Sequence, residues 1–436
     1  MHDLEKAART IFFETLRAVD LQASIRRRVR LDEGLLQVDE KAIDPSHFSE
    51  VILIGLGKAS LQMGQAVESL LGDHLTRGLL VTNRRAPLSL KSEVIVAGHP
   101  VPDAESMRAG KRALELLSNS LADSLVIFLI SGGGSSLLEV PISDEITLED
   151  LQQLNQILVN CGATIEEMNV VRKHFSAIKG GKLRKWMRAN RALALLVSDV
   201  NSGDIKTLAS NPLLPEEESA EQFQAIAEKY QLPDKLPQLF QPLVLSSSPA
   251  GPRLNENHEV HIDTMLLAEN QDVVKAAEPV AQRLGYRVWF DRAYDEETVE
   301  KTATRLIAAV VELRQAYPKD KLCVVSGGEV SCKIKGRGFG GRNQEFALHC
   351  VLKLKEVLAT ESLVLSCGTD GIDGRSIAVG ALAKASPTKD DWPMESRLVS
   401  YFEASDTASW FNESGGLLVT GPTGNNLRDL RIILAY

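Results

Sequence analysis

Short apolar runs alternate with amphipathic stretches through the first half of the chain. Buried strands are predicted where the runs are continuous and too short for helices. These runs are Val51–Leu56, Gly78–Val81, Val94–Ala97, Leu125–Ile130 and Ala192–Val197. Helical periodicity separates them, most clearly over Ala104–Leu117 and Glu166–Phe175. This alternation predicts a largely parallel sheet with helices on both faces, a three-layer α/β domain.

The composition changes between residues 236 and 257, where Pro, Ser, Gly and Asn replace the apolar runs. Ser246–Pro252 is the most linker-like stretch, and we expect domains of residues 1–245 and 246–436. A second α/β series follows, with helices expected over Leu266–Leu284 and Glu297–Ala316. Its expected strands are Arg287–Phe290, Leu322–Val325, Val330–Ile334, Leu363–Cys367 and Gly416–Val419.

The bulk properties narrow the class of protein. At 436 residues the chain exceeds one ordinary core, so two domains are expected. A formal charge of −9 argues against a nucleic-acid or anionic-membrane partner and favours a small-molecule enzyme. The five scattered cysteines and the absence of an apolar leader or long apolar run predict a cytoplasmic protein with reduced cysteines.

Two glycine turns follow predicted strands in the first half. Gly55–Ser60 (GLGKAS) lies between a strand and a helix, where backbone N–H groups and Lys58 can hold an anion. It matches neither the Walker A loop nor the dinucleotide fingerprint, and a plain βα turn is the alternative. The second turn, Gly132, Gly133, Gly134, Ser135 and Ser136, predicts a close backbone approach to phosphate, with close helix packing as the alternative.

Further polar residues stand at predicted strand and helix ends. Asp199 follows a buried strand, where it could bind magnesium, act as a base or simply form a turn. His99 lies between glycine and proline, so a rigid turn is the first interpretation and catalysis the second. Asn169–Gly181 fits a helix end with a glycine C-cap, where its cations are favourably placed near the negative end of the helix. A solvated face is the alternative.

Glycines and charges recur together in the second half. Ser326–Glu329 is a glycine turn that bears an acid, and Gly340–Phe346 (GGRNQEF) presents Arg342, whose planar fork can grip a carboxylate or phosphate. Gly368–Gly374 (GTDGIDG) adds Asp370 and Asp373. Thr420–Leu430 supplies hydroxyl and amide groups. The combination indicates a phosphoryl-transfer site.

Taken together, these segments resemble the glycerate 2-kinase family, also called the MOFRL family, over nearly the whole chain. The motifs GHPVPD, N-x-V-R-K-H-x-S-x-x-K-G-G, SGGE, GGRNQE, GTDGIDG and TGPTG occur in the family's order. The resemblance implies a Rossmann-like N-terminal domain, a smaller C-terminal domain with a mixed sheet, and an interdomain cleft. It implies transfer of the ATP γ-phosphoryl group to the 2-hydroxyl of D-glycerate, with Lys58, Asp199 and Arg342 as the polar core of the site.

Roles follow from that chemistry, which needs cations on phosphates, Mg²⁺ on carboxylates and a group to orient the hydroxyl. Lys58 is assigned to transition-state charge, Arg342 to the substrate carboxylate or phosphate, and Asp199 to the hydroxyl. Asp370 and Asp373 are the expected metal ligands. The expected nucleotide and phosphate contacts are Gly132, Gly133, Gly134, Ser135, Ser136, Glu329, Thr423 and Asn425.

Two departures from the family pattern leave the substrate open. The family's SDVxGDD reads Ser198–Asp204 (SDVNSGD) here, with the departures at Ser202 and Gly203, and PTDAAG reads Arg375–Gly380 (RSIAVG), so an acid is missing at Ile377. A kinase of another hydroxy or sugar acid is therefore an alternative. Hydroxypyruvate reductase and a non-catalytic nucleotide-binding relative are two more, and the oligomeric state is open.

Overall fold

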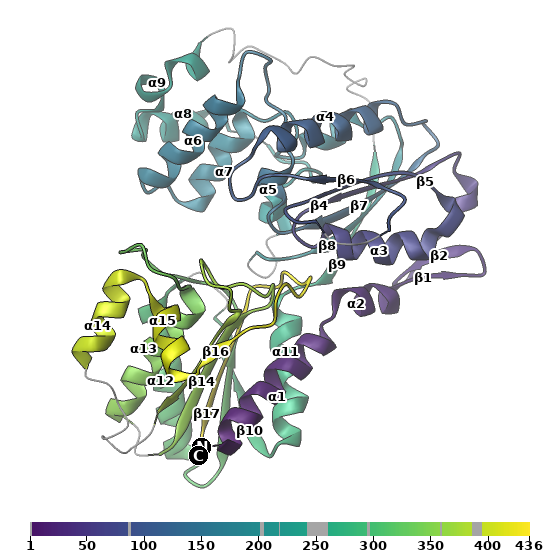
Figure 1. Cartoon of the computed structure of the whole chain (residues 1–436). Coiled ribbons are helices and arrows are strands. Elements are labelled where there is room, and N and C mark those ends of the chain that lie inside the picture. Colours follow the sequence, from purple (N-terminus) through teal and green to yellow (C-terminus); the bar gives the residue numbers. More distant parts are fainter. Residues whose placement is uncertain are drawn as a thin grey trace. The chain divides into compact units, whose positions relative to one another are not determined.

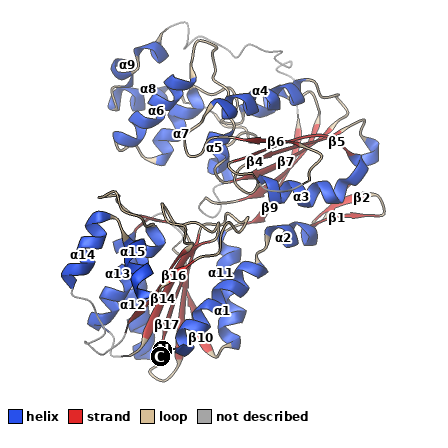
Figure 2. Cartoon of the chain, in the orientation of Figure 1, coloured by secondary structure: helices blue, strands red, loops and turns tan. Residues whose placement is uncertain are grey.

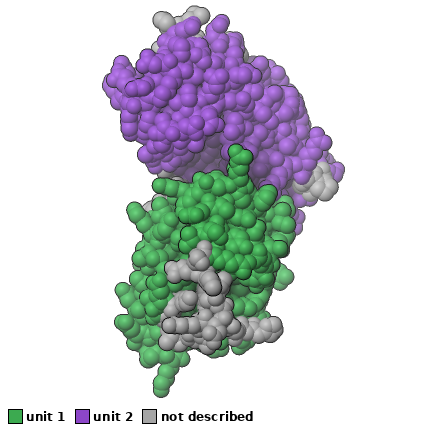
Figure 3. Space-filling model, turned by 60° about the vertical axis from the view of Figure 1, so that its left-hand side comes forward, with its two compact units in different colours: residues 1–21, 268–436 green, residues 22–267 purple. Residues whose placement is uncertain are grey.

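The computed structural model describes residues 2–85, 89–200, 205–217, 219–241, 260–293, 297–357, 360–385 and 395–436. The chain forms two compact units, one of residues 22–267 and one of residues 1–21 and 268–436 (Figure 3). Figures 1 and 2 show the elements of each unit. Among the described residues, no helix combines the length and the apolar character needed to cross a membrane.

Residues 22–267 contain a six-stranded sheet. Its strands are β4 (Val51–Leu56), β5 (Leu75–Thr82), β6 (Glu93–Val96), β7 (Leu125–Ser131), β8 (Arg191–Val197) and β9 (His261–Ala268). The order is β6-β5-β4-β7-β8-β9, and β6 through β8 pair in parallel. This order reverses between β4 and β7, as in doubly wound Rossmann-like sheets, so the fold-class prediction is confirmed for this unit.

Helices cover both faces of this sheet because side chains alternate along each strand. Ile52 and Ile54 of β4 share a buried core with Ala113 and Leu117 of α4 (Ala104–Ser118). The opposite face contacts α3 (Ser60–Leu71), as Figure 1 shows. The other elements of the unit are α2 (Leu21–Arg28), β1 (Val29–Asp32), β2 (Leu35–Val38), β3 (Lys41–Ile43), α5 (Gly134–Leu137), α6 (Leu148–Asn160), α7 (Ile165–His174), α8 (Ala220–Lys229) and α9 (Leu232–Lys235).

The second unit has a mixed six-stranded sheet. Its strands are β10 (Tyr286–Phe290), β12 (Lys321–Ser326), β14 (Ser362–Gly368), β15 (Gly380–Ala385), β16 (Leu417–Leu418) and β17 (Asp429–Ala435). The order is β10-β12-β17-β14-β15-β16, and only β10 and β12 pair in parallel. The mixed sheet predicted for the C-terminal domain is confirmed.

Helices flank this sheet too. The helices α1 (His2–Ala18) and α11 (Asn270–Arg283) pack together on one face, and α13 (Arg342–Val357) with α12 (Val299–Ala316) on the other (Figure 1). The short strands β11 (Glu297–Thr298) and β13 (Val330–Ser331) form a separate ladder. Helices α14 (Glu395–Ala404) and α15 (Thr407–Ser414) complete the unit.

Several element boundaries differ from those expected. β17 was not predicted, although it lies between β12 and β14. The helix expected from Leu266 begins only at Asn270, because residues 261–268 form β9. The expected strand Val330–Ile334 is only the two-residue β13. The first 21 residues belong to the C-terminal unit because α1 packs on α11, β14 and β17. The expected linker Ser246–Pro252 lies outside the described residues.

Candidate functional site

The carboxyl ends of adjacent parallel strands bring the first-half motifs together. β4 pairs with β7 at Leu56↔Ile130, and β7 pairs with β8 at Ser131↔Val197. Lys58, the turn from Gly132 and Asp199 therefore follow neighbouring strands, which lie about 4.8 Å apart. The sheet order reverses between β4 and β7, and open α/β sheets bind ligands at such a point.

Backbone contacts join the turn after β4 to the turn after β7. The Lys58 N–H donates to the Gly132 carbonyl at 2.9 Å, and the Ala59 N–H donates to Ser131 Oγ at 3.0 Å. Gly57 has φ +118°, and a Cβ there would lie 2.2 Å from Ser131 Oγ. Glycine is required at this position for both reasons, so the two turns are locked in one geometry.

A third loop joins them at Gly133. This residue has φ +81°, and a Cβ on it would lie 3.1 Å from Lys58 Cγ and from His99 Nε2. Burial, together with the charges of Lys58 and Arg84, lowers the pKa of His99 to about 4. The imidazole is therefore neutral at pH 7 and lies against the glycine turn and the lysine, where an anion can approach bare backbone.

A polar network extends from this turn into η4, the short 3₁₀ segment Ile205–Ser210. Ser135 Oγ and Ser210 Oγ are 2.7 Å apart, and Ser210 Oγ lies 3.3 Å from Asn169 Oδ1. Ser210 and both its neighbours, Ala209 and Asn211, have φ between +51° and +57°. Left-handed backbone costs about 1–2 kcal/mol per non-glycine residue and concentrates at functional sites. Sequence analysis missed this segment, because nothing in its composition indicates the conformation.

The cations of Asn169–Gly181 do not form a solvated face. Lys173 is buried and pairs with Glu216 at 2.6 Å. Lys179 and Glu139 are both buried and pair with each other. Burying a lysine needs such a partner, so this alternative is wrong for both lysines, which instead join segments distant in sequence.

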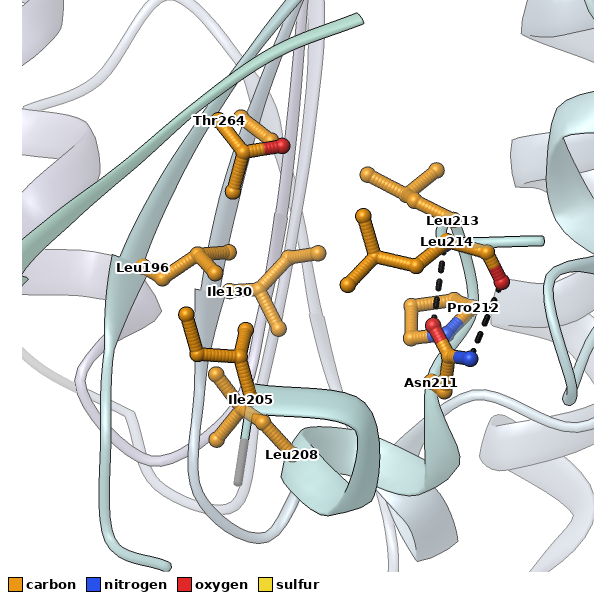
Figure 4. Close-up of a pocket in the computed structure, with 10 residues that line it drawn as sticks. Ile130, Leu196, Ile205, Leu208, Asn211, Pro212, Leu213, Leu214 and Thr264 are labelled. Carbon is orange, nitrogen blue, oxygen red and sulfur yellow. Dashed lines mark hydrogen bonds between the residues drawn. The ribbon is translucent and has the colours of Figure 1, made fainter. Parts of the chain in front are cut away.

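A cavity of about 20 Å³ lies beside η4 and the ends of β7 and β8 (Figure 4). The Asn211 side chain bonds the Leu214 N–H and carbonyl at its rim, both at 2.9 Å. One water needs about 10–15 Å³, so this space is too small for a nucleotide or a hydroxy acid. Its lining residues are Ile130, Ala194, Leu196, Ile205, Leu208, Asn211, Pro212, Leu213, Leu214 and Thr264.

In the other unit, Arg342 stands at the first residue of α13. Its Nε and Nη2 donate to the two oxygens of buried Asp429, each at 2.9 Å, and Nη1 lies 2.8 Å from Glu329. Burial alone would lower the pKa of Arg342, but Asp429 and Glu329 outweigh it and raise the pKa. The guanidinium therefore joins α13, β17 and the SGGE turn. Its side chain is 31% exposed, so an anion can still approach it.

Asp373 lies behind the same helix start and is only 1% exposed. Its two oxygens accept the N–H groups of Asn343 and Gln344, both at 3.0 Å. Burial raises the pKa of Asp373 to about 6, although these N–H groups oppose the rise. The carboxylate thus satisfies helix donors, a role that sequence analysis did not assign; metal binding by Asp373 stays a prediction.

The remaining predicted residues of this unit lie in linked loops. Asp370 is partly exposed, and its Oδ1 accepts the Ile372 N–H at 3.1 Å. The Thr423 N–H donates to the Asp370 carbonyl at 3.3 Å, and Thr423 Oγ1 accepts the Asn425 N–H at 3.1 Å. Asp370, Thr423 and Asn425 are therefore brought together by the fold.

Two buried charges were missed. Asp429 is the partner of Arg342, and buried Arg431 donates to the Gly328 carbonyl at 3.2 Å and to that of Gly327. Burial lowers the pKa of Arg431, whereas Arg342 keeps that of Asp429 low despite burial. The signal was present in the sequence as R-D-L-R before an apolar run.

The departures from the family pattern are partly visible. Arg375 is exposed and Ile377 is 81% exposed, so no side chain covers the position where the motif of the resembled family has an acid. Ser202, Gly203 and Asp204 lie outside the described residues. The structure therefore does not explain the departure at Ser202 and Gly203.

The fold and the turns at the reversal of the parallel sheet define a two-unit α/β protein of the kind that binds phosphate-bearing ligands. A domain of unknown function, DUF4147, matches residues 7–244, and the MOFRL family matches residues 322–429. The chain belongs to the glycerate 2-kinase (MOFRL) family, as the resemblance implied.

Three relatives illustrate the likeness. D-glycerate 2-kinase of Thermotoga maritima is 34% identical over 88% of this chain and 91% of its own length. A putative hydroxypyruvate reductase of Agrobacterium vitis is also 34% identical, over 88% and 86%. The crystal structure of a glycerate kinase from Thermotoga maritima superposes with a TM-score of 0.79 at 30% identity and covers both chains fully.

Proposed function

We propose that this protein is an ATP- and Mg²⁺-dependent kinase that phosphorylates the 2-hydroxyl of D-glycerate and forms 2-phosphoglycerate and ADP. The observation that carries the proposal is the meeting of Lys58 with the Gly132–Ser136 turn at the sheet reversal, in a chain of this family. Relatives named glycerate 2-kinase support the choice of acceptor.

The reaction forms a bond between the acceptor hydroxyl oxygen and the γ-phosphorus. The bond from that phosphorus to the β–γ bridging oxygen breaks, ADP leaves with the electron pair, and the hydroxyl proton passes to Asp199. Lys58 stabilises charge on the transferring group, and backbone N–H groups of Gly132–Ser136 hold the other phosphates. Neutral His99 adds no charge beside the turn, so the positive charge there comes from Lys58 and Arg84.

The carboxylate of Asp370 suits Mg²⁺ better than that of Asp373 does. Mg²⁺ binds through one or two carboxylates and keeps several waters, which a partly exposed loop permits. Asp370 is partly exposed, whereas both oxygens of buried Asp373 accept helix N–H groups. When bound, Mg²⁺ would neutralise charge on the phosphates.

The roles proposed for the other unit are ligand contacts. Arg342 approaches an anionic group with its exposed portion while Asp429 fixes its fork. Glu329, Thr423 and Asn425 remain proposed nucleotide contacts, since they lie in glycine turns that border Arg342 and Asp370.

Another small hydroxy or sugar acid is the alternative acceptor, because exposed Arg375 adds a cation beside Ile377. Hydroxypyruvate reduction is a second alternative, carried by the name of one relative. Against it, Ser60 occupies the third fingerprint position, and its hydroxyl donates to the Val81 carbonyl at 2.7 Å.

One experiment separates these functions. The protein is incubated with ATP, Mg²⁺ and each of a panel of hydroxy acids, and ADP is measured together with the position of the new phosphate by ³¹P NMR. A parallel reaction contains hydroxypyruvate with NADH or NADPH. The kinase proposal would be overturned if none of the hydroxy acids raised ADP release above background. Oxidation of NADH or NADPH with hydroxypyruvate, in place of ADP release, would also overturn it.

A matched pair of variants tests the proposed phosphate site. Lys58→Ala should lower kcat by about a hundredfold or more, since it removes charge stabilisation from the transition state. Lys111→Ala removes an exposed lysine from α4 and should leave kcat unchanged. Equal rates for both variants would remove Lys58 from the site.

A further inference from the structure

Two carboxylates and an imidazole converge between α12 and α13. They belong to Glu300, Glu345 and His349, and one ligand atom from each lies within 4.8 Å of the other two. Glu345 and His349 are four residues apart on α13, so they point from the same side of the helix. This cluster shares no residue with the site proposed for phosphoryl transfer.

The fold brings the third ligand to this pair by two contacts. Helices α12 and α13 pack side by side in the same layer. The β11–β13 ladder, with Thr298 opposite Ser331, fixes the start of α12, where Glu300 is the second residue. Cys332 follows β13 directly.

The charges of the cluster are unbalanced. Glu345 is only 8% exposed, and no ion pair reaches it among the residues that the structure describes. Burying a carboxylate without a cation costs free energy, so a bound cation would stabilise this cluster.

His349 is suited to bind a metal ion. Its side chain is partly buried, and an imidazole is mostly neutral at pH 7. The Phe402 ring packs against it with centroids 4.5 Å apart, which restricts its orientation. A pre-oriented neutral imidazole is the usual nitrogen ligand of transition metals.

We propose that Glu300, Glu345 and His349 bind a divalent transition-metal ion of the Zn²⁺ type, which joins α12 to α13. An imidazole with two carboxylates is a known kind of ligand set for zinc-like ions, whereas Mg²⁺ prefers oxygen alone. Two carboxylates neutralise the dication, and exposed Glu300 leaves the site open to solvent. The proposal does not depend on the kinase function.

An exposed lysine offers another way to balance the charge. Lys335 is close enough to lower the pKa of both Glu345 and His349. If its ammonium group fills the role of the cation, a metal ion will not bind the cluster. Lys335→Ala separates the two possibilities, since its removal should leave Zn²⁺ binding intact or strengthen it.

The test uses the full chain stripped with EDTA and then titrated with Zn²⁺ by calorimetry. The wild type and Lys335→Ala should bind one more Zn²⁺ per chain than His349→Gln and Glu345→Gln do. If the ligand variants still bind this Zn²⁺, their affinity for it should be lower by about tenfold or more. His47→Gln, which removes a 79% exposed imidazole in the other unit, and Glu356→Gln on the exposed side of α13 are the matched controls and should bind like the wild type. Equal stoichiometry and affinity in the wild type and His349→Gln would overturn the proposal.

Thermal unfolding gives a second readout that does not require activity. Zn²⁺ should raise the Tm of the wild type and both controls but not that of His349→Gln or Glu345→Gln, because a ligand stabilises only the state that binds it. If Mg²⁺ rather than Zn²⁺ produced the His349-dependent rise, the assignment to a transition metal would be wrong.

Discussion

Replacing Asp373 by Asn should change the pH dependence of stability in a defined direction. The Asp373 carboxyl is fully buried, and burial raises its pKa to about 6 from its ordinary value of 3.8. Between these pH values the unfolded chain releases the proton while the folded chain retains it. The contribution of this carboxyl to the free energy of unfolding is therefore greatest below pH 3.8, falls as the pH rises toward 6, and is constant above that.

The size of the effect follows from the two pKa values. Their difference of about 2 corresponds to about 3 kcal/mol, since one pKa unit is 1.36 kcal/mol. Asn cannot ionise and keeps only one acceptor oxygen, much like the protonated acid. The free energy of unfolding of Asp373→Asn, relative to that of the wild type, should increase by about 2–3 kcal/mol from pH 4 to pH 7.

Urea unfolding followed by circular dichroism at pH 4, 5, 6 and 7, in EDTA, measures this difference. Asp429→Asn is the matched control in the same buried network. Arg342 keeps the pKa of Asp429 below its ordinary value, so the loss in this variant should be nearly constant across that range. A flat or opposite trend for Asp373→Asn would show that the folded chain stabilises the Asp373 charge through its N–H partners, and it would refute the reasoning.

Three further substitutions test the geometry. Gly133→Ala should lower kcat/KM for ATP about tenfold or more. Gly34→Ala, at the same φ of +81° but in open space, should cost only about 1–2 kcal/mol of stability. Equal losses of kcat/KM in both variants would contradict the close approach at Gly133. Arg342→Lys loses the bidentate grip on its buried partner and should lower the free energy of unfolding by about 1–3 kcal/mol in denaturant titrations, and an unchanged value would mean that this grip does not hold α13. Lys179→Met should cost about 3–5 kcal/mol by the same measurement, and adding Glu139→Gln should recover most of it; no recovery would refute the buried pair.

The parallel sheet was predictable because its central strands are continuous apolar runs. Strands buried on both faces must be apolar throughout, and β4, β7 and β8 were identified from such runs. β17 was missed although it is also buried, because Asp429 and Arg431 interrupt its apolar run. Asp429 pairs with Arg342, and Arg431 donates to carbonyls of the SGGE turn; both partners are distant in sequence.

The candidate residues divide in a similar way. Glycine turns after strands located Lys58 and Gly133, since positions with positive φ or bare backbone favour glycine in the sequence. Arg342 was located by the glycines and cations around it. The capping role of Asp373 left none, because an acid between glycines suits a metal loop as well as a helix start. Only the packing of α13 against its loop assigns both carboxylate oxygens to N–H groups.

The sequence by itself determined the class of fold, the glycine turns and the family, because these depend on local periodicity and on residue types at fixed spacing. Tertiary structure decided which charges are buried and what each one contacts. It decided that Lys179 pairs with Glu139, that the first helix joins the C-terminal unit, and that Glu300 meets Glu345 and His349. The physical reason is that desolvation and pairing depend on neighbours separated along the chain, and no local pattern records them.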